Sequence, residues 1–333
     1  MALMRPYSVP YRYFSIRRAL FVWLCPVFLG AGCVVAGPDV PLTGLASRYG
    51  MKIAASDDMR VEVSGKGCVM TLKADSREMT FNGIRVWLHA PALKHRRRWL
   101  VSKTDAETVV QPLLSVRHRP VSARPFKVML DPGHGGVDSG AIGLSGRHEK
   151  DLVLDIAERT RQRLVQADVT VRMTREADIG VGLRERPSLA EAWGADIFVS
   201  IHLNSASNSD ANGLETFVLT AANAPSTNTG ATNGIAYPGH RHAAANMVLA
   251  YHAHRRLLQR TGAADRGIRH ARFEALKHAT CPAILVEGGF LSHPEEEQKL
   301  LSASYRDRIA EALADGILDY AGRTSAPGKD KKP

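Results

Sequence analysis

Three stretches of this sequence read as buried strands, and each leads directly into an imidazole or a carboxylate. The stretches and their side chains are residues 127–131 with His134, residues 196–201 with His202, and residues 283–286 with Glu287. Glu149 is a fourth candidate, because it opens an amphipathic helix one loop after the first histidine. The carboxyl ends of parallel strands meet at one edge of a sheet, so these distant residues can converge.

Two imidazoles and one carboxylate form a ligand set that holds zinc and leaves one position open for water. A second carboxylate nearby, not bound to the metal, could take a proton from that water. Other roles stay open for each residue at this point. A histidine at a strand end is more often a hydrogen-bonded structural residue, and Glu149 also suits the first turn of a helix. Glu215 lies within an apolar strand and could pair across the sheet.

The remaining histidines and cysteines are expected to have structural roles. Four histidines are assigned to a loop edge and to the solvated face of a helix, and not to a metal: His240, His242, His252 and His254. Cys25 and Cys33 belong to the N-terminal segment, and Cys68 and Cys281 lie far apart in the chain, so no disulfide framework is expected. Cys281 precedes an apolar run and is expected to be a small core residue.

The segments that must position the chemistry alternate between strand and helix from residue 126 onward. Besides the three strands above, the expected elements are helices at 149–166, 183–193 and 242–260, terminal helices within 294–320, and strands at 169–173 and 214–219. Pro187 is expected to interrupt the second helix, and residues 221–240 are expected to form a long loop. This alternation predicts an α/β domain with a mixed, mostly parallel sheet and helices on both faces.

A different pattern precedes this domain. Short alternating runs read as strands, and Asn82-Gly83 is a strong signal for a hairpin turn between two of them. The stretch from Gln111 to Pro125 is rich in proline and basic residues and reads as linker. The expected order is a small β-rich domain at 40–118, a linker at 119–125, the α/β domain at 126–321 and a disordered tail at 322–333.

Residues 1–33 have the features of a targeting segment. Arg17-Arg18 precede an apolar run, which ends in the small residues Gly30-Ala31-Gly32 before Cys33. A positively charged region, a short apolar run and small residues at the position of a cleavage site indicate a secretory signal peptide. Cys33 also suits a lipoprotein signal, with attachment to an outer or inner membrane, and an uncleaved anchor is a third reading. All three readings export the protein to the periplasm or the cell envelope.

The net charge of +11 suggests acidic partners, either nucleic acid or the anionic bacterial envelope. The basic residues between Lys94 and Arg124 are expected to form a solvated surface. No nucleic-acid-binding motif accompanies them, so no nucleic-acid partner is expected.

Residues 130–141, Leu-Asp-Pro-Gly-His-Gly-Gly-Val-Asp-Ser-Gly-Ala, resemble the opening signature of the zinc-dependent N-acetylmuramoyl-L-alanine amidases of type 3. Further motifs of that family follow in order: residues 149–157, Thr174-Arg175 with Asp178, Leu183 with Arg184 and Arg186, residues 200–204, Tyr237-Pro238-Gly239, residues 265–268 and residues 285–292. The resemblance covers about residues 126–321, the whole of the expected α/β domain.

The resemblance implies a role for each candidate. His134, Glu149 and His202 would hold one zinc ion, and Glu287 would be the catalytic carboxylate. Arg266 and Asn204 would lie in the substrate cleft. The implied reaction is hydrolysis of the amide between N-acetylmuramic acid and L-alanine of the peptidoglycan stem peptide. Two departures from the family pattern, His293 and Val153, bear on substrate contacts and not on the implied ligands.

A weaker resemblance concerns residues 40–118, which are similar in pattern to the copper-amine-oxidase N-terminal-like module of secreted bacterial proteins. It implies an accessory or wall-targeting unit, with a plain spacer as the alternative. The implied setting is cell-wall remodelling or daughter-cell separation, with peptidoglycan as partner and any protein activator unknown. The alternative functions are another zinc-dependent wall peptidase or carboxypeptidase, or a non-catalytic peptidoglycan-binding protein.

Overall fold

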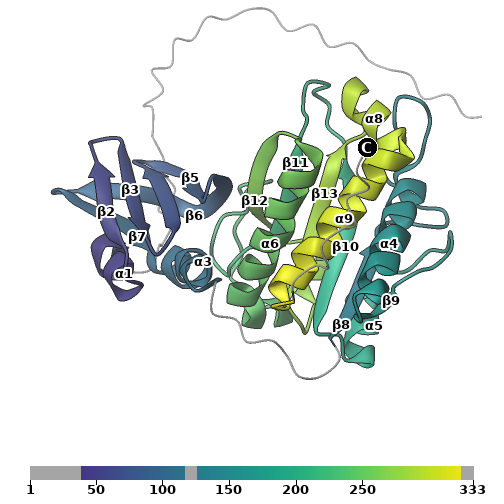
Figure 1. The fold of residues 1–333 in the computed structure, drawn as a ribbon, viewed down its shortest axis with the longest axis horizontal. Coiled ribbons are helices and arrows are strands. Elements are labelled where there is room, and N and C mark those ends of the chain that lie inside the picture. Colours follow the sequence, from purple (N-terminus) through teal and green to yellow (C-terminus); the bar gives the residue numbers. More distant parts are fainter. Residues whose placement is uncertain (1–38, 117–125, 324–333) are drawn as a thin grey trace, which may run out of the picture. The chain divides into compact units, whose positions relative to one another are not determined.

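The computed structural model describes residues 39–116 and 126–323 (Figure 1). The predicted targeting segment 1–33, the predicted linker 119–125 and nearly all of the predicted tail lie outside the described residues. Among the described helices, none is both long enough and apolar enough to cross a membrane. The predicted division of the chain into a signal, two domains, a linker and a tail stays a prediction.

The first described segment is rich in antiparallel strands. Its elements are β1 (Asp39–Pro41), α1 (Leu42–Arg48), β2 (Lys52–Ser56), β3 (Arg60–Gly65), β4 (Cys68–Lys73), β5 (Ser76–Phe81), β6 (Ile84–His95) and β7 (Arg98–Ser102). The expected hairpin joins β5 to β6. Asn82 and Gly83 both have positive φ, 49° and 82°, as a two-residue turn that matches strand twist requires.

Residues 103–114 are helical, and no helix was predicted there from the sequence. They form α2 (Lys103–Asp105), a π-helical turn η1 (Ala106–Val110) and α3 (Gln111–Leu114). The prediction of linker from Gln111 is therefore wrong for its first turn. Leu113 and Val110 are fully buried, so apolar packing stabilises this helix, and Pro112 lies at its start, where no backbone donor is needed.

The second described segment alternates between strand and helix, as predicted. Its elements are β8 (Lys127–Pro132), α4 (Glu149–Gln166), β9 (Thr170–Met173), α5 (Glu185–Trp193), β10 (Ile197–Asn204), β11 (Leu214–Leu219), the 3-10 turn η3 (Pro238–His242), α6 (Ala243–Thr261), β12 (Asp265–Ala271), α7 (Glu274–Lys277), β13 (Ala283–Phe290), α8 (Pro294–Leu301) and α9 (Ala303–Tyr320). Pro187 does not interrupt α5, because the helix begins two residues later than expected and the proline falls within its first turn.

The strand order is β12-β11-β13-β10-β8-β9, and β6 pairs with β12 at the other edge of this set. Strands β9, β8, β10 and β13 are parallel, whereas β11 runs antiparallel to β13 and parallel to β12. The predicted α/β fold with a mixed, mostly parallel sheet is confirmed.

Helices cover both faces of this sheet. Helices α4, α6 and α9 pack on one face (Figure 1), while the shorter α5 and α7 contact the other. Because successive side chains on a strand alternate between faces, Val199 enters the core under α4 and α9, and Phe198 enters the smaller cluster on the α5 and α7 side. His202 has the same parity as Phe198, so its side chain leaves β10 on the second face, at the carboxyl end of the strand.

Candidate metal centre

The three strand ends that carry candidate residues lie at one edge of the sheet, as predicted. Strand β10 is hydrogen-bonded to β8 on one side and to β13 on the other, with all three parallel. His202 is directly opposite Glu287 in this register. Glu149, the first residue of α4, approaches the same edge across the loop that follows β8.

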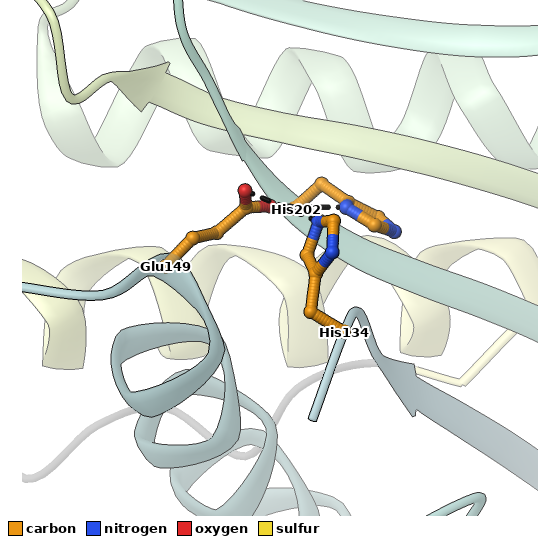
Figure 2. Close-up of side chains that lie close together, drawn as sticks. All are labelled: His134, Glu149 and His202. Carbon is orange, nitrogen blue, oxygen red and sulfur yellow. Dashed lines mark hydrogen bonds and ion pairs between the residues drawn. The ribbon is translucent and has the colours of Figure 1, made fainter. Parts of the chain in front are cut away.

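His134, Glu149 and His202 converge on one point, as Figure 2 shows. Their potential ligand atoms all lie within 4.8 Å of one another. Oε2 of Glu149 lies 3.1 Å from Nε2 of His134, and Oε1 lies 3.0 Å from Nδ1 of His202. The carboxylate is buried, whereas about a quarter and a fifth of the two imidazoles are exposed (24% and 20%). The cluster therefore opens to solvent on its histidine side.

Backbone donors position the buried carboxylate before any metal binds. Glu149 accepts hydrogen bonds from the amides of Ala141 (2.8 Å) and Leu203 (2.9 Å). Burial would raise the pKa of Glu149, but the hydrogen bonds and charges of His134 and His202 outweigh it and hold the pKa far below its usual range. The carboxylate is therefore ionised at neutral pH, as a metal ligand must be.

Asp138 orients the first histidine. Its Oδ2 lies 2.8 Å from Nδ1 of His134, so Nε2 is the ring nitrogen that faces Glu149. A carboxylate on the far nitrogen of a ligand histidine is the usual outer-shell arrangement at metal sites. Burial lowers the pKa of His134, but Glu149 and Asp138 together raise it above its ordinary value. The sequence motif contains Asp138 without indicating this role, although its position four residues after His134 is a usable signal.

The chemistry of this donor set fits a zinc ion. Two imidazole nitrogens and one ionised carboxylate converge, and the exposed side of the cluster leaves room for water. Two buried thiols are present among the described residues, Cys68 and Cys281, and neither belongs to the cluster. Burial raises the pKa of Cys281 to about 12, which agrees with its predicted role in the core.

Two glycines of the first loop, Gly133 and Gly140, allow close packing around the cluster. A Cβ on Gly133 would overlap the imidazole of His202. A Cβ on Gly140 would lie 2.6 Å from both Oε2 of Glu149 and Cδ2 of His134. His134 itself has φ 59°, in the left-handed region that strains any residue other than glycine.

Two buried arginines hold this strained loop. Nη1 of Arg186 donates to Oδ1 of Asp131 (2.7 Å) and to the carbonyl of Pro132 (2.9 Å), and Nη2 donates to the carbonyl of His134 (2.7 Å). Arg175 donates from Nε to Pro132 (3.0 Å) and from Nη2 to Gly133 (2.8 Å). Three consecutive carbonyls of the loop are therefore fixed by guanidinium groups. Sequence reasoning identified both arginines as motif members but assigned them no role.

Glu287 lies beside the cluster and differs from Glu149 in its surroundings. Its Oε2 is shielded from solvent and accepts no hydrogen bond from the described residues. Burial raises the pKa of Glu287 well above its usual value, and the charges of Glu149 and Glu215 add to the effect.

The two predicted cleft residues lie at the same edge and are joined by Glu215. Nδ2 of Asn204 donates to Oε2 of Glu215 (3.0 Å), and Nε of Arg266 donates to its Oε1 (2.7 Å). Glu215 does pair across the sheet, as one reading held, and Arg269 is its second cationic partner. Arg266 belongs to β12.

The assignment of four histidines to solvated positions is wrong in part. His254 is fully buried, with Nδ1 2.9 Å from Oγ1 of Thr216 and Nε2 3.0 Å from Oδ1 of Asp265. It lies on the inner face of α6 and takes no part in the metal cluster. His240 hydrogen-bonds to the carbonyl of Thr220 (3.0 Å).

Known proteins share this fold and sequence. The chain is 33% identical over 224 residues to the N-acetylmuramoyl-L-alanine amidase AmiA of Escherichia coli, a match covering 58% of this chain and 75% of that protein. It resembles the solved structures of the amidase AmiC2 of Nostoc punctiforme (37% identity, TM-score 0.52, covering 61% of this chain and all of that one) and of the CwlV catalytic domain of Bacillus (Paenibacillus) polymyxa (34%, 0.51, 59% and 98%).

The model of one protein family matches residues 128–319, which includes every candidate residue of the metal centre. That family is described as N-acetylmuramoyl-L-alanine amidase. The resemblance of residues 40–118 to the copper-amine-oxidase-like module is untested by these matches and stays a prediction. From Val128 onward the motifs, the fold and the relatives agree, and the chain belongs to the N-acetylmuramoyl-L-alanine amidase family.

Proposed function

We propose that this chain is an exported zinc amidase that hydrolyses the amide between N-acetylmuramic acid and L-alanine in peptidoglycan. The observation that carries the proposal is the convergence of His134, Glu149 and His202 beside Glu287 at one edge of the sheet. Family membership supports the reaction class. The three converging residues would hold the metal, and Glu287 would handle the proton.

Zinc would supply Lewis acidity, which polarises the scissile carbonyl and lowers the pKa of a bound water towards neutrality. Glu287 would accept a proton from the attacking water and deliver it to the leaving amine of L-alanine, which closes the proton balance of hydrolysis. The shielded position of Glu287, whose Oε2 accepts no hydrogen bond from the part of the chain that the structure describes, leaves that oxygen free for such transfer. Glu149 is unsuited to this task because backbone donors and both histidines already occupy its oxygens.

The cellular setting follows from the N-terminal sequence and the substrate. Residues 1–33 would direct export to the periplasm or envelope, either as a cleaved signal or through lipid attachment at Cys33. Residues 40–118 would serve as an accessory unit for wall targeting. Amide cleavage removes stem peptides from glycan strands, which suits wall remodelling and daughter-cell separation.

The test is digestion of purified sacculi by the mature protein, with identification of the released fragments. We expect stem peptides with a free L-alanine amino group, together with new lactyl carboxylates on the glycan. Chelation should abolish release, and zinc should restore it. Release of single amino acids or internal peptide fragments, without new lactyl carboxylates, would identify a wall peptidase instead. Binding to sacculi without any release would identify a non-catalytic wall-binding protein.

A further inference from the structure

A polar row continues from the metal cluster across three adjacent strands. His202 on β10 is opposite Glu287 on β13, and Glu287 is opposite Glu215 on β11. The next strand, β12, supplies Arg266 and Arg269, which both contact the Glu215 carboxylate. The row therefore places two guanidinium groups at the same edge as the proposed catalytic carboxyl group, on the side away from Glu149.

Glu215 holds both arginines in this part of the row. Glu215 is buried, and its oxygens accept from Arg266, Arg269 and Asn204. One carboxylate is thus shared by two guanidinium groups. Glu296, a nearby acid, is engaged elsewhere, because its oxygens accept from the backbone amides of Gly213 (2.9 Å) and Phe290 (2.8 Å).

Arg266 is the more accessible of the two cations. Its side chain is 34% exposed, against 19% for Arg269. Nε is anchored on Glu215, and the guanidinium carbon lies 4.9 Å from the ring centre of Phe290. Nη1 makes one long contact with the carbonyl of Asn212 (3.5 Å), and within the described residues Nη2 donates to no protein group. A planar guanidinium held in this way presents unused donors to a carboxylate.

Arg269 is also incompletely satisfied. It donates from Nη1 to Glu215 and from Nη2 to the carbonyl of Thr227 (3.3 Å), while its shielded Nε finds no acceptor among the described residues. By contrast, the guanidinium groups of Arg175 and Arg186 are taken up by backbone carbonyls and Asp131. Among these four described arginines, the guanidinium N–H donors without a protein acceptor therefore belong to Arg266 and Arg269.

We propose that Arg266, supported by Glu215 and Arg269, forms a subsite for a carboxylate of the substrate's peptide. The inference rests on the proposed function and adds a preference for acidic over amidated peptides. Arg266 lies two strand spacings from Glu287 along the row, roughly 10 Å. An extended peptide advances about 3.3 Å per residue, so the recognised carboxylate belongs to the second or third residue of the stem.

The test uses paired N-acetylmuramoyl-L-alanyl peptides of two to four residues, each ending either in a free carboxylate or in a carboxamide. We expect the zinc-loaded protein to prefer the carboxylate by roughly tenfold in kcat/KM, most strongly when it is on the second or third residue. Arg266→Gln should bring the ratio of carboxylate to carboxamide close to one, and Arg266→Lys should keep part of the preference. Arg184→Gln is the matched control, because that arginine is 78% exposed and pairs only loosely with Glu274 (3.5 Å).

Binding of the L-alanyl peptides themselves, measured calorimetrically, separates this proposal from the proposed function. If hydrolysis is absent but the protein binds the carboxylate peptides more tightly and Arg266→Gln removes the difference, the subsite stands and the amidase proposal fails. Equal values for carboxylate and carboxamide in the unmodified protein would overturn the subsite. So would a ratio that Arg266→Gln leaves unchanged while the variant retains its zinc and its thermal stability.

Discussion

Replacing Arg186 by lysine should weaken zinc binding more than it weakens the fold. Lysine keeps the positive charge but cannot reproduce the planar fork that reaches Asp131, Pro132 and His134 together. The carbonyl of His134 is the group that matters, because φ of that residue is 59° and the loop holds it in a strained conformation. Without the fork, the imidazole is no longer held at its position facing Glu149.

The expected size follows from the lost contacts. Hydrogen bonds to a charged group contribute about 1.5–3 kcal/mol each, and lysine should lose at least the bond to His134 and one other. Water and the retained ammonium recover part of that loss, so we expect a net effect of about 2–3 kcal/mol. Part of it appears as lower stability of the metal-free protein, and the rest as a zinc affinity reduced roughly 10- to 100-fold.

The assay is competition for zinc against a chromophoric chelator at neutral pH, with urea unfolding of the metal-free protein measured in parallel. Arg184→Lys is the control, because it alters an arginine of the same segment that is 78% exposed and pairs with Glu274, away from the carbonyls that Arg186 holds. If Arg186→Lys lowers the free energy of unfolding but leaves the zinc dissociation constant within about twofold of the unmodified value, the positioning argument is wrong.

Three further results are expected. Glu287→Gln should retain zinc and lose roughly 10²- to 10⁴-fold in kcat, and full activity in this variant would exclude the proposed proton transfer. Zinc affinity should fall as pH is lowered, starting above the ordinary histidine pKa of about 6.5, because Glu149 and Asp138 raise the pKa of His134 and protons compete with the metal; a dissociation constant that stays flat from pH 8 to 6 would contradict this. Gly133→Ala should lower zinc occupancy through overlap with the His202 ring, which the metal content of the purified variant will show.

The residues that converge on the metal could be found from sequence because they occupy the ends of regular elements. An apolar run stopped by Asp-Pro-Gly fixes where β8 ends, and His202 and Glu287 extend equally apolar strands. Once three strands are taken as parallel, their carboxyl ends must share an edge. Spacing alone left open which glutamate binds the metal, and that choice came from the family resemblance.

The residues that support the site could not be found in this way. Arg175 and Arg186 look like ordinary polar positions beside an exposed loop, and only the tertiary structure shows that they point inward to carbonyl groups. His254 was misplaced for a related reason, because the turn of α6 that carries it also carries the partly buried arginines Arg255 and Arg256. Buried polar groups are specified by distant partners, which a local pattern does not contain.

The charge pattern of the polar row explains why Glu287 differs from its neighbours. Glu149 is hydrogen-bonded to two imidazoles, and Glu215 pairs with two guanidinium groups. Glu287 lies between them without a cationic partner among the described residues, and burial with two neighbouring negative charges raises its pKa. A divalent cation at the three ligands would lower that pKa again. The same carboxyl group would then be able to accept a proton from water and return it to the amine.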